Sequence, residues 1–430
     1  MPFDPTAAPP RSIAVIGGGI SGMGAAHMLS GRHNVTLFEA EPRLGGHART
    51  KIAGKRGDQP VDTGFIVFNY ANYPHMAQLF ETLGVPVAKS NMSFSASLNG
   101  GALEYGLQGP RSLFAQPKNA FNPRYLRMIR DIFYFNKHAL DAAQDRSLTL
   151  GAFLEKMGTG DWFRDYYLLP LSGAIWSTPT EQVLDFPAHA LIQFFENHAL
   201  LHHSGQHQWY TVQGGSVEYV RRLETAMQNR GVAIRSGVPV QAVRRDAAGV
   251  EIKARGDWQR FDEVVFATHS DDSLRMLDDP SADETANLGA VRYQPNRVVL
   301  HADASIMPKR KVVWGSWNYT EAAKKDVNTI DLTYWMNCLQ PIPQDDPMFV
   351  TLNSARPIRD ELIYDETVLR HPVYDLGALD AQKRVAAQNG TNHTWFCGAW
   401  MKNGFHEDGL SSAVDIVRAI EARDQVEQAA

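Results

Sequence analysis

A glycine-rich turn near the N-terminus is the feature that most constrains how this chain can fold. The apolar run 12–16 is typical of a buried parallel strand, and residues 20–30 follow it with a helical pattern. Between them the sequence Gly17-Gly-Gly19-Ile-Ser21-Gly22 matches G-x-G-x-x-G. A second apolar run, 35–38, completes a β-α-β unit of roughly 30 residues. The chain is therefore predicted to contain a doubly wound α/β sheet.

This turn has the composition of a dinucleotide cradle. The first glycine permits a tight turn, the second lets the backbone approach a pyrophosphate, and the third lets helix and strand pack closely. Ser21 lies within the turn, and the following helix directs unpaired N–H groups and a positive dipole at the phosphates. Glu39, at the end of the second strand, can accept hydrogen bonds from ribose hydroxyls, with Ala40 next to it. NAD and FAD both fit this unit.

The next segment separates the two cofactors. Arg43-Leu-Gly45-Gly46-His47 adds a second glycine pair, which extends the close-approach backbone along a longer cofactor, and Arg43 can pair with phosphates. Here the sequence resembles the FAD-binding superfamily of flavin amine oxidases, phytoene desaturases and protoporphyrinogen oxidases. The resemblance implies an FAD cofactor held by a Rossmann-like domain of the GR2 type, with an inserted α+β substrate domain.

Later segments continue the resemblance. It implies backbone contacts of Val240 with the adenine, a strand that returns to the sheet at Ala267, and a C-terminal helix whose N-terminus points at the flavin. The corresponding residues are Gly398, Gly409, Leu410 and Ser411. The chain departs from the family where Ala399 replaces an acidic residue that commonly contacts the ribityl chain.

The domains are expected to interleave. Segments 1–75, 206–275 and 390–430 form the predicted FAD-binding domain, while 76–205, mostly helical, and 276–389, with a mixed sheet, form the substrate domain. A second G-x-G-x-x-G and a Cys-x-x-Cys pair are both missing from the sequence, so we expect no NAD(P)-binding domain and no dithiol chemistry. This pattern favours a flavin that is reduced by an organic substrate.

Several blocks suggest a narrower relationship. The sequence resembles a bacterial subfamily of flavoproteins that accompany methyltransferases similar to cyclopropane-fatty-acid synthases. The resemblance lies in segments 167–170, 174–177, 186–187, 197–198, 209–216, 314–319 and 333–340. The resemblance implies a fatty-acyl desaturase that converts a methylated unsaturated acyl chain to a conjugated diene, as in furan fatty acid synthesis, and a methyltransferase partner. A flavin amine oxidase and a non-catalytic flavoprotein partner of a lipid methyltransferase are the alternatives.

Catalytic candidates come from the substrate domain and the C-terminal loop. Trp317 and Tyr334 alternate on predicted strands that could face the flavin, although core packing would also explain them. His406 and Glu407 stand just before the flavin-facing helix and are candidate proton acceptors, with loop and helix-capping roles as the alternative. The group His198, His202, His203 and His207 lacks metal-ligand spacing, so no metal is expected.

Charge and hydropathy limit the kinds of partner that this protein can have. The net charge is −5, which argues against nucleic-acid binding, and no apolar run approaches the roughly 18 residues of a membrane-spanning helix. Segment 111–137 nevertheless carries six basic residues against one acid, interleaved with aromatic residues. Such a segment can lie on an anionic bilayer, or it can be an ordinary helix pair with a solvated basic face. The N-terminus lacks the pattern of a secretory signal, so a cytoplasmic protein is expected, with peripheral contact with the inner face of the membrane as one of the two alternatives for segment 111–137.

Overall fold

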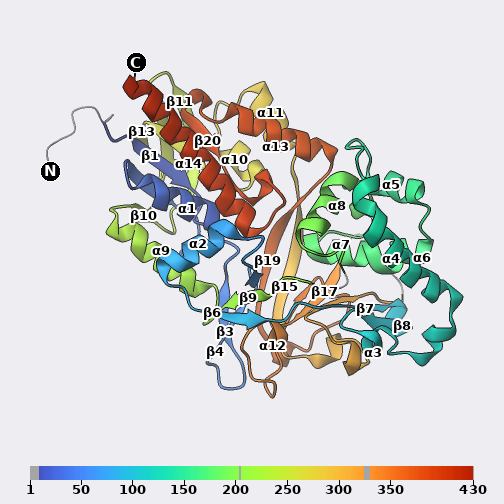
Figure 1. Cartoon of the computed structure of the whole chain (residues 1–430). Helices are drawn as coiled ribbons and strands as arrows, with labels where there is room; N and C mark the ends of the chain where they lie inside the picture. The colour runs from blue at the N-terminus through green and yellow to red at the C-terminus, as the bar shows by residue number, and fades with distance from the viewer. Residues whose placement is uncertain (1–8, 203–204, 324–329, 430) are drawn as a thin grey trace.

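The computed structural model describes residues 9–202, 205–323 and 330–429. A five-stranded parallel sheet assembles from segments far apart in the sequence (Figure 1). Its strand order is β10 (Ala233–Arg235), β2 (Asn34–Phe38), β1 (Ser12–Ile16), β14 (Glu263–Phe266) and β20 (Thr394–Phe396). The central strand β1 is buried on both faces, which explains its continuous apolar sequence.

Helices cover one face of this sheet and a mixed layer covers the other. The first layer contains α1 (Ile20–Leu29), α9 (Val217–Asn229) and α14 (His406–Ala429), which share one apolar cluster with the sheet. The second layer contains the antiparallel strands β11 (Val240–Asp246), β12 (Gly249–Ala254) and β13 (Asp257–Phe261), with helices α10 (Ser270–Met276), α11 (Ala282–Gly289) and α13 (Leu376–Gln388). This three-layer arrangement confirms the predicted FAD-type α/β fold.

A second, larger sheet forms the substrate domain. Its seven strands run in the order β19 (Ile363–Val373), β15 (Arg292–His301), β18 (Phe349–Leu352), β17 (Asp331–Trp335), β16 (Trp317–Thr320), β7 (Phe94–Leu98) and β8 (Leu103–Gly106). Most neighbours are antiparallel, and only β16 and β7 run parallel. Two small sheets, β3 (Thr50–Ala53) with β4 (Gln59–Asp62), and β5 (Val67–Phe68) with β9 (Trp209–Val212) and β6 (Val87–Ser90), connect the two domains.

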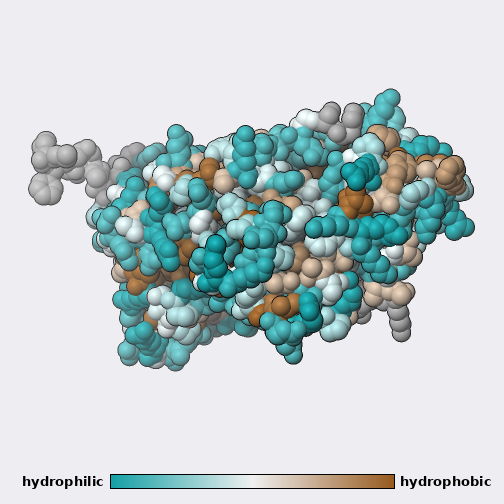
Figure 2. Space-filling view, turned by 90° about the horizontal axis from the view of Figure 1, so that it is seen from below, coloured by the Kyte–Doolittle hydropathy of each residue, from teal (hydrophilic) through white to brown (hydrophobic). Residues whose placement is uncertain are grey.

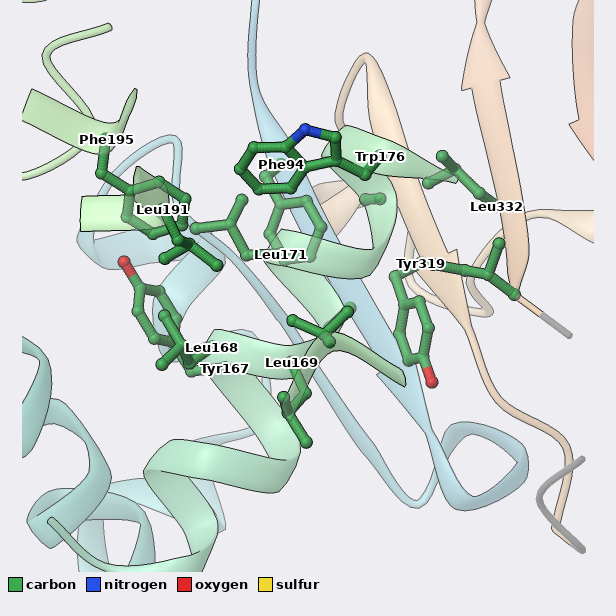
Figure 3. Packing of buried hydrophobic residues seen from close by; sticks show 14 of the residues in the cluster. Phe94, Tyr167, Leu168, Leu169, Leu171, Trp176, Leu191, Phe195, Tyr319 and Leu332 are labelled. Atoms are coloured by element: carbon green, nitrogen blue, oxygen red, sulfur yellow. The ribbon is translucent and has the colours of Figure 1, made fainter. Parts of the chain in front are cut away.

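A helical unit packs beside the second sheet. It comprises α4 (Pro123–Ala142), α5 (Leu150–Met157), α6 (Asp161–Phe163), a π-helical turn (Arg164–Leu168), α7 (Leu169–Trp176) and α8 (Ala188–Asn197). Figure 3 shows α7 between α8, which contributes Leu191 and Phe195, and the sheet, which contributes Tyr319 and Leu332. One apolar cluster therefore joins the helical unit to the sheet. Among the described residues, no helix combines the length and apolar character needed to cross a bilayer.

Two features differ from the sequence-based expectations. Strands β6, β7 and β8 lie within 76–205, among the helices that were expected there. In β7 all five residues of Phe-Ser-Ala-Ser-Leu are buried, so its two serines take core positions as its apolar residues do. The proposed boundary at residues 75 and 76 falls inside α2 (Pro74–Leu83), which packs against α9 and α14 of the FAD-type domain. The boundary at 275 and 276 likewise falls inside α10.

Candidate flavin and substrate site

The turn between β1 and α1 has the backbone geometry that only glycine allows. Gly17 adopts a positive φ of 107°, and its N–H donates to the carbonyl of Phe38 on β2 at 2.8 Å. A Cβ atom added to Gly22 would lie 1.8 Å from the carbonyl oxygen of Gly17. Backbone conformation and steric clashes inside the protein therefore require glycine at the first and third positions of the motif.

The second glycine faces open space instead. A Cβ atom on Gly19 would meet nothing within 4 Å, although the residue stands at the N-terminus of α1. The second glycine pair lies against it: the N–H of Gly45 donates to the carbonyl of Gly18 at 2.8 Å, and a Cβ on Gly46 would lie 3.1 Å from the Cα of Gly19. Two glycine loops thus border an open region at a helix N-terminus, which fits a pyrophosphate.

Glu39 lies at the edge of this cradle. Its carboxylate accepts hydrogen bonds from the N–H of Gly18 at 2.5 Å and from the N–H of Glu41 at 2.7 Å. A carboxylate has about four lone-pair sites, so acceptor capacity remains for ribose hydroxyls. The N–H of Val238 donates to the carbonyl of Glu39, which brings the chain that enters β11 at Val240 beside the cradle. The exposed Ala40 follows Glu39.

Arg43 supports the second glycine loop from within. Its guanidinium donates to the carbonyl oxygens of Gly46 at 3.0 Å and Ala48 at 3.2 Å, and forms an ion pair with Glu41. These bonds fix the loop that carries Gly45 and Gly46. The predicted contact of Arg43 with cofactor phosphates stays a prediction.

The C-terminal segment closes the other side of the cradle. Ala267 follows β14. A Cβ atom added to Gly17 would lie 2.9 Å from the carbonyl oxygen of Ala267. The N–H of Gly398 donates to the hydroxyl of Ser412 at 2.9 Å. A Cβ on Gly409 would meet the Ser21 hydroxyl oxygen at 2.8 Å, so the N-termini of α1 and α14 touch there. Two helix N-termini therefore converge at one place, as a cofactor with several anionic oxygens requires.

Next to Gly409 on α14, the two other predicted contact residues take different environments. The side chain of Leu410 packs against Gly24 of α1, where a Cβ would lie 2.5 Å from Leu410 Cδ1. The hydroxyl of Ser411 accepts a hydrogen bond from Lys402. The predicted contacts of Leu410 and Ser411 with the cofactor stay predictions.

Three histidines gather where the two domains meet. The ring of His47 lies 5.4 Å from that of His371 on β19 and 6.0 Å from that of His269, which follows β14. Burial lowers the pKa of His47 to about 4 and the pKa values of His269 and His371 to about 3. At neutral pH this cluster is therefore uncharged. Of the three histidines, only His47 was predicted from the sequence to be a site residue.

His406 and Glu407 have very different surroundings. The His406 ring stacks on Phe65 with centroids 4.1 Å apart, and its Nε2 shares a 2.6 Å hydrogen bond with the hydroxyl of Tyr219. Burial lowers the pKa of His406 to about 3. The carboxylate of Glu407 accepts the N–H groups of His75 and Met76, each at 2.9 Å, at the N-terminus of α2. Glu407 thus caps a helix, which was the alternative to proton transfer, while the ring of His406 is neutral at physiological pH.

An aromatic junction, formed by Trp176, Phe186, Phe194 and Phe405, covers the loop that leads into α14. Phe405 stacks on Phe194 of α8, with centroids 4.9 Å apart and planes 16° apart. The Trp176 ring lies 4.8 Å from Phe194, and its indole N–H donates to the carbonyl of Asn403. Sequence reasoning missed Phe194 and Phe405, although Phe405 directly precedes the candidate His406.

Trp317 and Tyr334 stand next to this junction. They are directly opposite each other on β16 and β17, with ring centroids 5.3 Å apart in an edge-to-face arrangement. The Tyr334 hydroxyl is hydrogen bonded to Ser177, the residue after Trp176, and burial raises the pKa of Tyr334 far above the usual range of a phenol. Both residues are only partly buried and border the core, so they fit the predicted position on the substrate side.

The paired glycine loops, the carboxylate of Glu39 and the converging helix N-termini form a cradle of the kind found in doubly wound dinucleotide-binding proteins. The model of the flavin-containing amine oxidoreductase family matches residues 20–347, and the chain belongs to that family. It is therefore a member of a family of flavin-containing oxidoreductases.

Individual relatives are more distant. Coproporphyrinogen III oxidase of Mycobacterium tuberculosis is 41% identical over 80 residues, which cover 18% of this chain and only 17% of that relative. A fatty acid isomerase from P. acnes that produces CLA has the same fold, with a TM-score of 0.67 at 14% identity over 95% of this chain and 98% of that one. Putrescine oxidase bound to putrescine is similar in fold, with a TM-score of 0.66 at 14% identity over 96% of this chain and 99% of that one.

Proposed function

We propose that this protein binds FAD and oxidises an unsaturated fatty acyl chain, removing hydrogen from carbon to give a conjugated diene. The observation that carries the proposal is the aromatic junction, which meets the cofactor cradle through Phe405 and His406. Its side chains are apolar and the adjoining His406 is neutral because burial lowers its pKa to about 3. A hydrocarbon substrate requires such a surface.

FAD fits the residues that are present. The open region at Gly19 and the N-termini of α1 and α14 would hold the pyrophosphate, and Glu39 would hold the adenosine ribose. A bound flavin supplies a two-electron acceptor for hydrogen removed from carbon. The chain supplies no acid at position 399, so the ribityl chain would rely on backbone donors there.

The aromatic junction would position the substrate and exclude water. Phe405, Phe194 and Trp176 form an apolar wall in which a flexible acyl chain can be held extended. Trp317 and Tyr334 extend this wall along the sheet, and the Tyr334 hydroxyl stays protonated because burial raises its pKa. Holding the reacting carbon in one place lowers the entropic part of the barrier, and a dry site prevents side reactions.

His406 is the side chain best suited to accept a proton. Its ring is fixed between Phe65 and the hydroxyl of Tyr219, and it is neutral over the physiological pH range. A weak base suffices because an allylic proton next to a developing positive charge is acidic. Glu407 is committed to the backbone of α2 and is not assigned this role.

The substrate is further specified by resemblance. A methylated monounsaturated acyl chain, as in furan fatty acid synthesis, is the substrate that the similar bacterial subfamily suggests, and a methyltransferase partner would supply it. The fold shared with a fatty acid isomerase is compatible with an acyl substrate. The fold shared with putrescine oxidase keeps amine oxidation as the second candidate.

Anaerobic reduction of the bound flavin tests the proposal. The purified yellow protein is mixed without oxygen with a methylated monounsaturated fatty acid or its phospholipid, and separately with putrescine and benzylamine. We expect bleaching of the visible flavin bands by the lipid alone. Bleaching by amines alone would establish the second candidate, and no bleaching by either would point to a non-catalytic flavoprotein.

A matched pair of variants tests the location of the site. Phe405→Asp introduces a carboxylate into the aromatic junction, whereas Ile52→Asp makes the same kind of change at a side chain that is 62% exposed. We expect the first variant to keep its flavin but to lose reduction by lipid at least tenfold, and the second to behave like the wild type. Equal reduction rates in both variants would place the substrate elsewhere.

A further inference from the structure

The outward face of α4 alternates apolar and basic side chains. Leu126, Arg130, Phe133 and Lys137 follow one another at intervals of four, three and four residues, which places them on one side of the helix. The opposite side, with Tyr125, Met128, Phe135 and Ala139, is buried in the helical unit. The helix is therefore anchored by one face and presents the other to its surroundings.

Large apolar side chains on this face are unusually exposed. Phe121, just before the helix, is 87% exposed, and Phe133 is 56% exposed. Leu126 and Tyr134 are each 44% exposed. Figure 2 shows hydrophobic residues among hydrophilic ones at the end of the molecule where Figure 1 places α4 and α6. Apolar side chains exposed together in this way are typical of an interaction surface.

The charge of the same surface is strongly positive. Its basic residues are Arg111, Lys118, Arg124, Arg127, Arg130 and Lys137. The one acid of segment 111–137, Asp131, is buried, where it accepts the N–H of Gly160 at 2.9 Å and pairs with Arg130 at 2.9 Å. Segment 111–137 thus carries a net charge of +5 in a protein whose net charge as a whole is −5.

We propose that the surface formed by Phe121 and the outward face of α4 docks on an anionic lipid bilayer. Basic side chains alternate with apolar ones instead of surrounding an apolar centre, so the long stems of Arg130 and Lys137 can reach lipid phosphates while Phe121 and Phe133 enter the acyl boundary. An interface with another protein would instead have an apolar core with a polar rim.

The surface is connected to the candidate site by packing. Phe135 of α4 contacts Phe163, with ring centroids 5.2 Å apart, and Phe163 contacts Tyr167 at 5.5 Å, in the turn that leads into α7 and Trp176. Docking would therefore place α4 and α6 between the bilayer and the aromatic junction. The inference rests on the surface alone and does not depend on the proposed reaction.

Co-sedimentation with vesicles tests the docking without any turnover. The flavin-loaded protein is mixed with vesicles of phosphatidylcholine and phosphatidylglycerol in equal amounts, or of phosphatidylcholine alone, at about 0.1 M and about 1 M salt. We expect at least tenfold stronger partitioning to the anionic vesicles, and loss of most of it at high salt, because each basic residue near the surface contributes about fivefold.

Two pairs of variants identify the surface. Arg130→Glu with Lys137→Glu should abolish partitioning, whereas Arg384→Glu with Arg418→Glu, the same charge change at exposed sites on α13 and α14, should leave at least half of it. Phe121→Ser with Phe133→Ser should weaken partitioning about tenfold or more, while Ile52→Ser with Val368→Ser, also exposed, should not. Thermal melting and flavin content confirm that each variant is folded.

Three results would overturn the proposal. These are absence of wild-type binding to anionic vesicles, equal binding to neutral vesicles, and unchanged binding of the Arg130→Glu and Lys137→Glu variant. A wild type that binds no vesicle but depends on Arg130 and Lys137 to bind a purified acidic protein would assign the surface to a protein partner instead. Flavin reduction by detergent-dispersed lipid is independent of all these outcomes, so failure of docking and failure of the proposed reaction are distinguishable.

Discussion

Single glycines in the cradle act by two different physical means. Gly22 is required because a Cβ would collide with the backbone oxygen of Gly17, whereas Gly19 borders open space. We expect Gly22→Ala to lower the free energy of unfolding of the flavin-free protein by about 3 kcal/mol or more. Gly19→Val should cost only about 1 kcal/mol, as a changed helix N-cap does, yet reduce flavin content at least tenfold.

Denaturant unfolding of the flavin-free proteins and the visible spectra of the purified proteins measure the two quantities. Gly289→Val provides a control, because a Cβ on Gly289 would meet only Leu274 Cδ2, at an ordinary contact distance of 3.8 Å, and the residue is remote from the motif in sequence. A Gly19→Val protein with stoichiometric flavin would contradict the assignment of the pyrophosphate site.

The buried histidines make stability depend on pH. Burial lowers the pKa of His371 to about 3 from 6.5, so between these values the unfolded chain binds a proton that the folded chain does not. The contribution of His371 is therefore fully present above about pH 6.5 and is lost as the pH falls. We expect His371→Gln to flatten this decline by up to about 1.4 kcal/mol per pH unit.

Unfolding by guanidinium at about pH 5 and about pH 7.5 checks this expectation, with His138→Gln as the control for loss of an exposed histidine. Buried carboxyl groups act in the opposite direction, because burial raises the pKa values of Asp62 and Asp408 to about 6. Their protonation favours the folded state below that pH. An unchanged slope in His371→Gln would show that the histidine is already protonated in the folded protein.

At the scale of elements, Glu407 joins two helices. It belongs to the first turn of α14, and its carboxylate binds the N-terminus of α2. We expect Glu407→Gln to lower the free energy of unfolding by about 1 kcal/mol, since it replaces a charged cap by a neutral one. Substrate-dependent flavin reduction should keep its rate and its pH profile. A rate loss of tenfold or more with unchanged stability would restore Glu407 as a proton acceptor.

The elements that were predicted correctly have strong local signals, and those that were missed do not. Strands β1 and β2 and helix α1 follow from apolar runs separated by glycines. Strand β7 was not predicted because polar residues take core positions in it. Ser95 and Ser97 are buried, with hydrogen bonds to Asn318 and Glu104 respectively. The π-helical turn before α7 likewise has no local sequence signal, although Pro170, which lacks an N–H, lies two residues after its end.

At the scale of the whole molecule, a buried hydrogen-bond pair connects the two domains. Gln340, from the substrate domain, donates to the carboxylate of Asp62 and accepts the N–H of the same residue, each at 2.9 Å. We expect Gln340→Leu to lower the free energy of unfolding by about 1–3 kcal/mol, because it leaves the buried N–H of Asp62 without its acceptor and removes one of several donors to the Asp62 carboxylate. The loss should be larger at about pH 7.5 than at about pH 5, since Gln340 stabilises the ionised form of Asp62.

Denaturant unfolding at both pH values provides the measurement. Gln344→Leu is the control, because this glutamine donates to the carbonyl of Asn337 within the substrate domain. Equal losses in the two variants would mean that the pair at Asp62 has no special part in joining the domains. A loss confined to Gln340→Leu would assign the coupling to this contact.

The sequence by itself determined the cofactor cradle of this protein, because Gly17, Gly22 and Glu39 act through local backbone geometry within one β-α-β unit. Only the tertiary structure decided the substrate side. Phe65, Phe194 and Phe405 are far apart in the chain, and no local pattern distinguishes a phenylalanine in a site from one in the core. The same holds for Glu407, whose role depends on where α2 begins. Contacts between distant segments carry no periodicity, so packing alone reveals them.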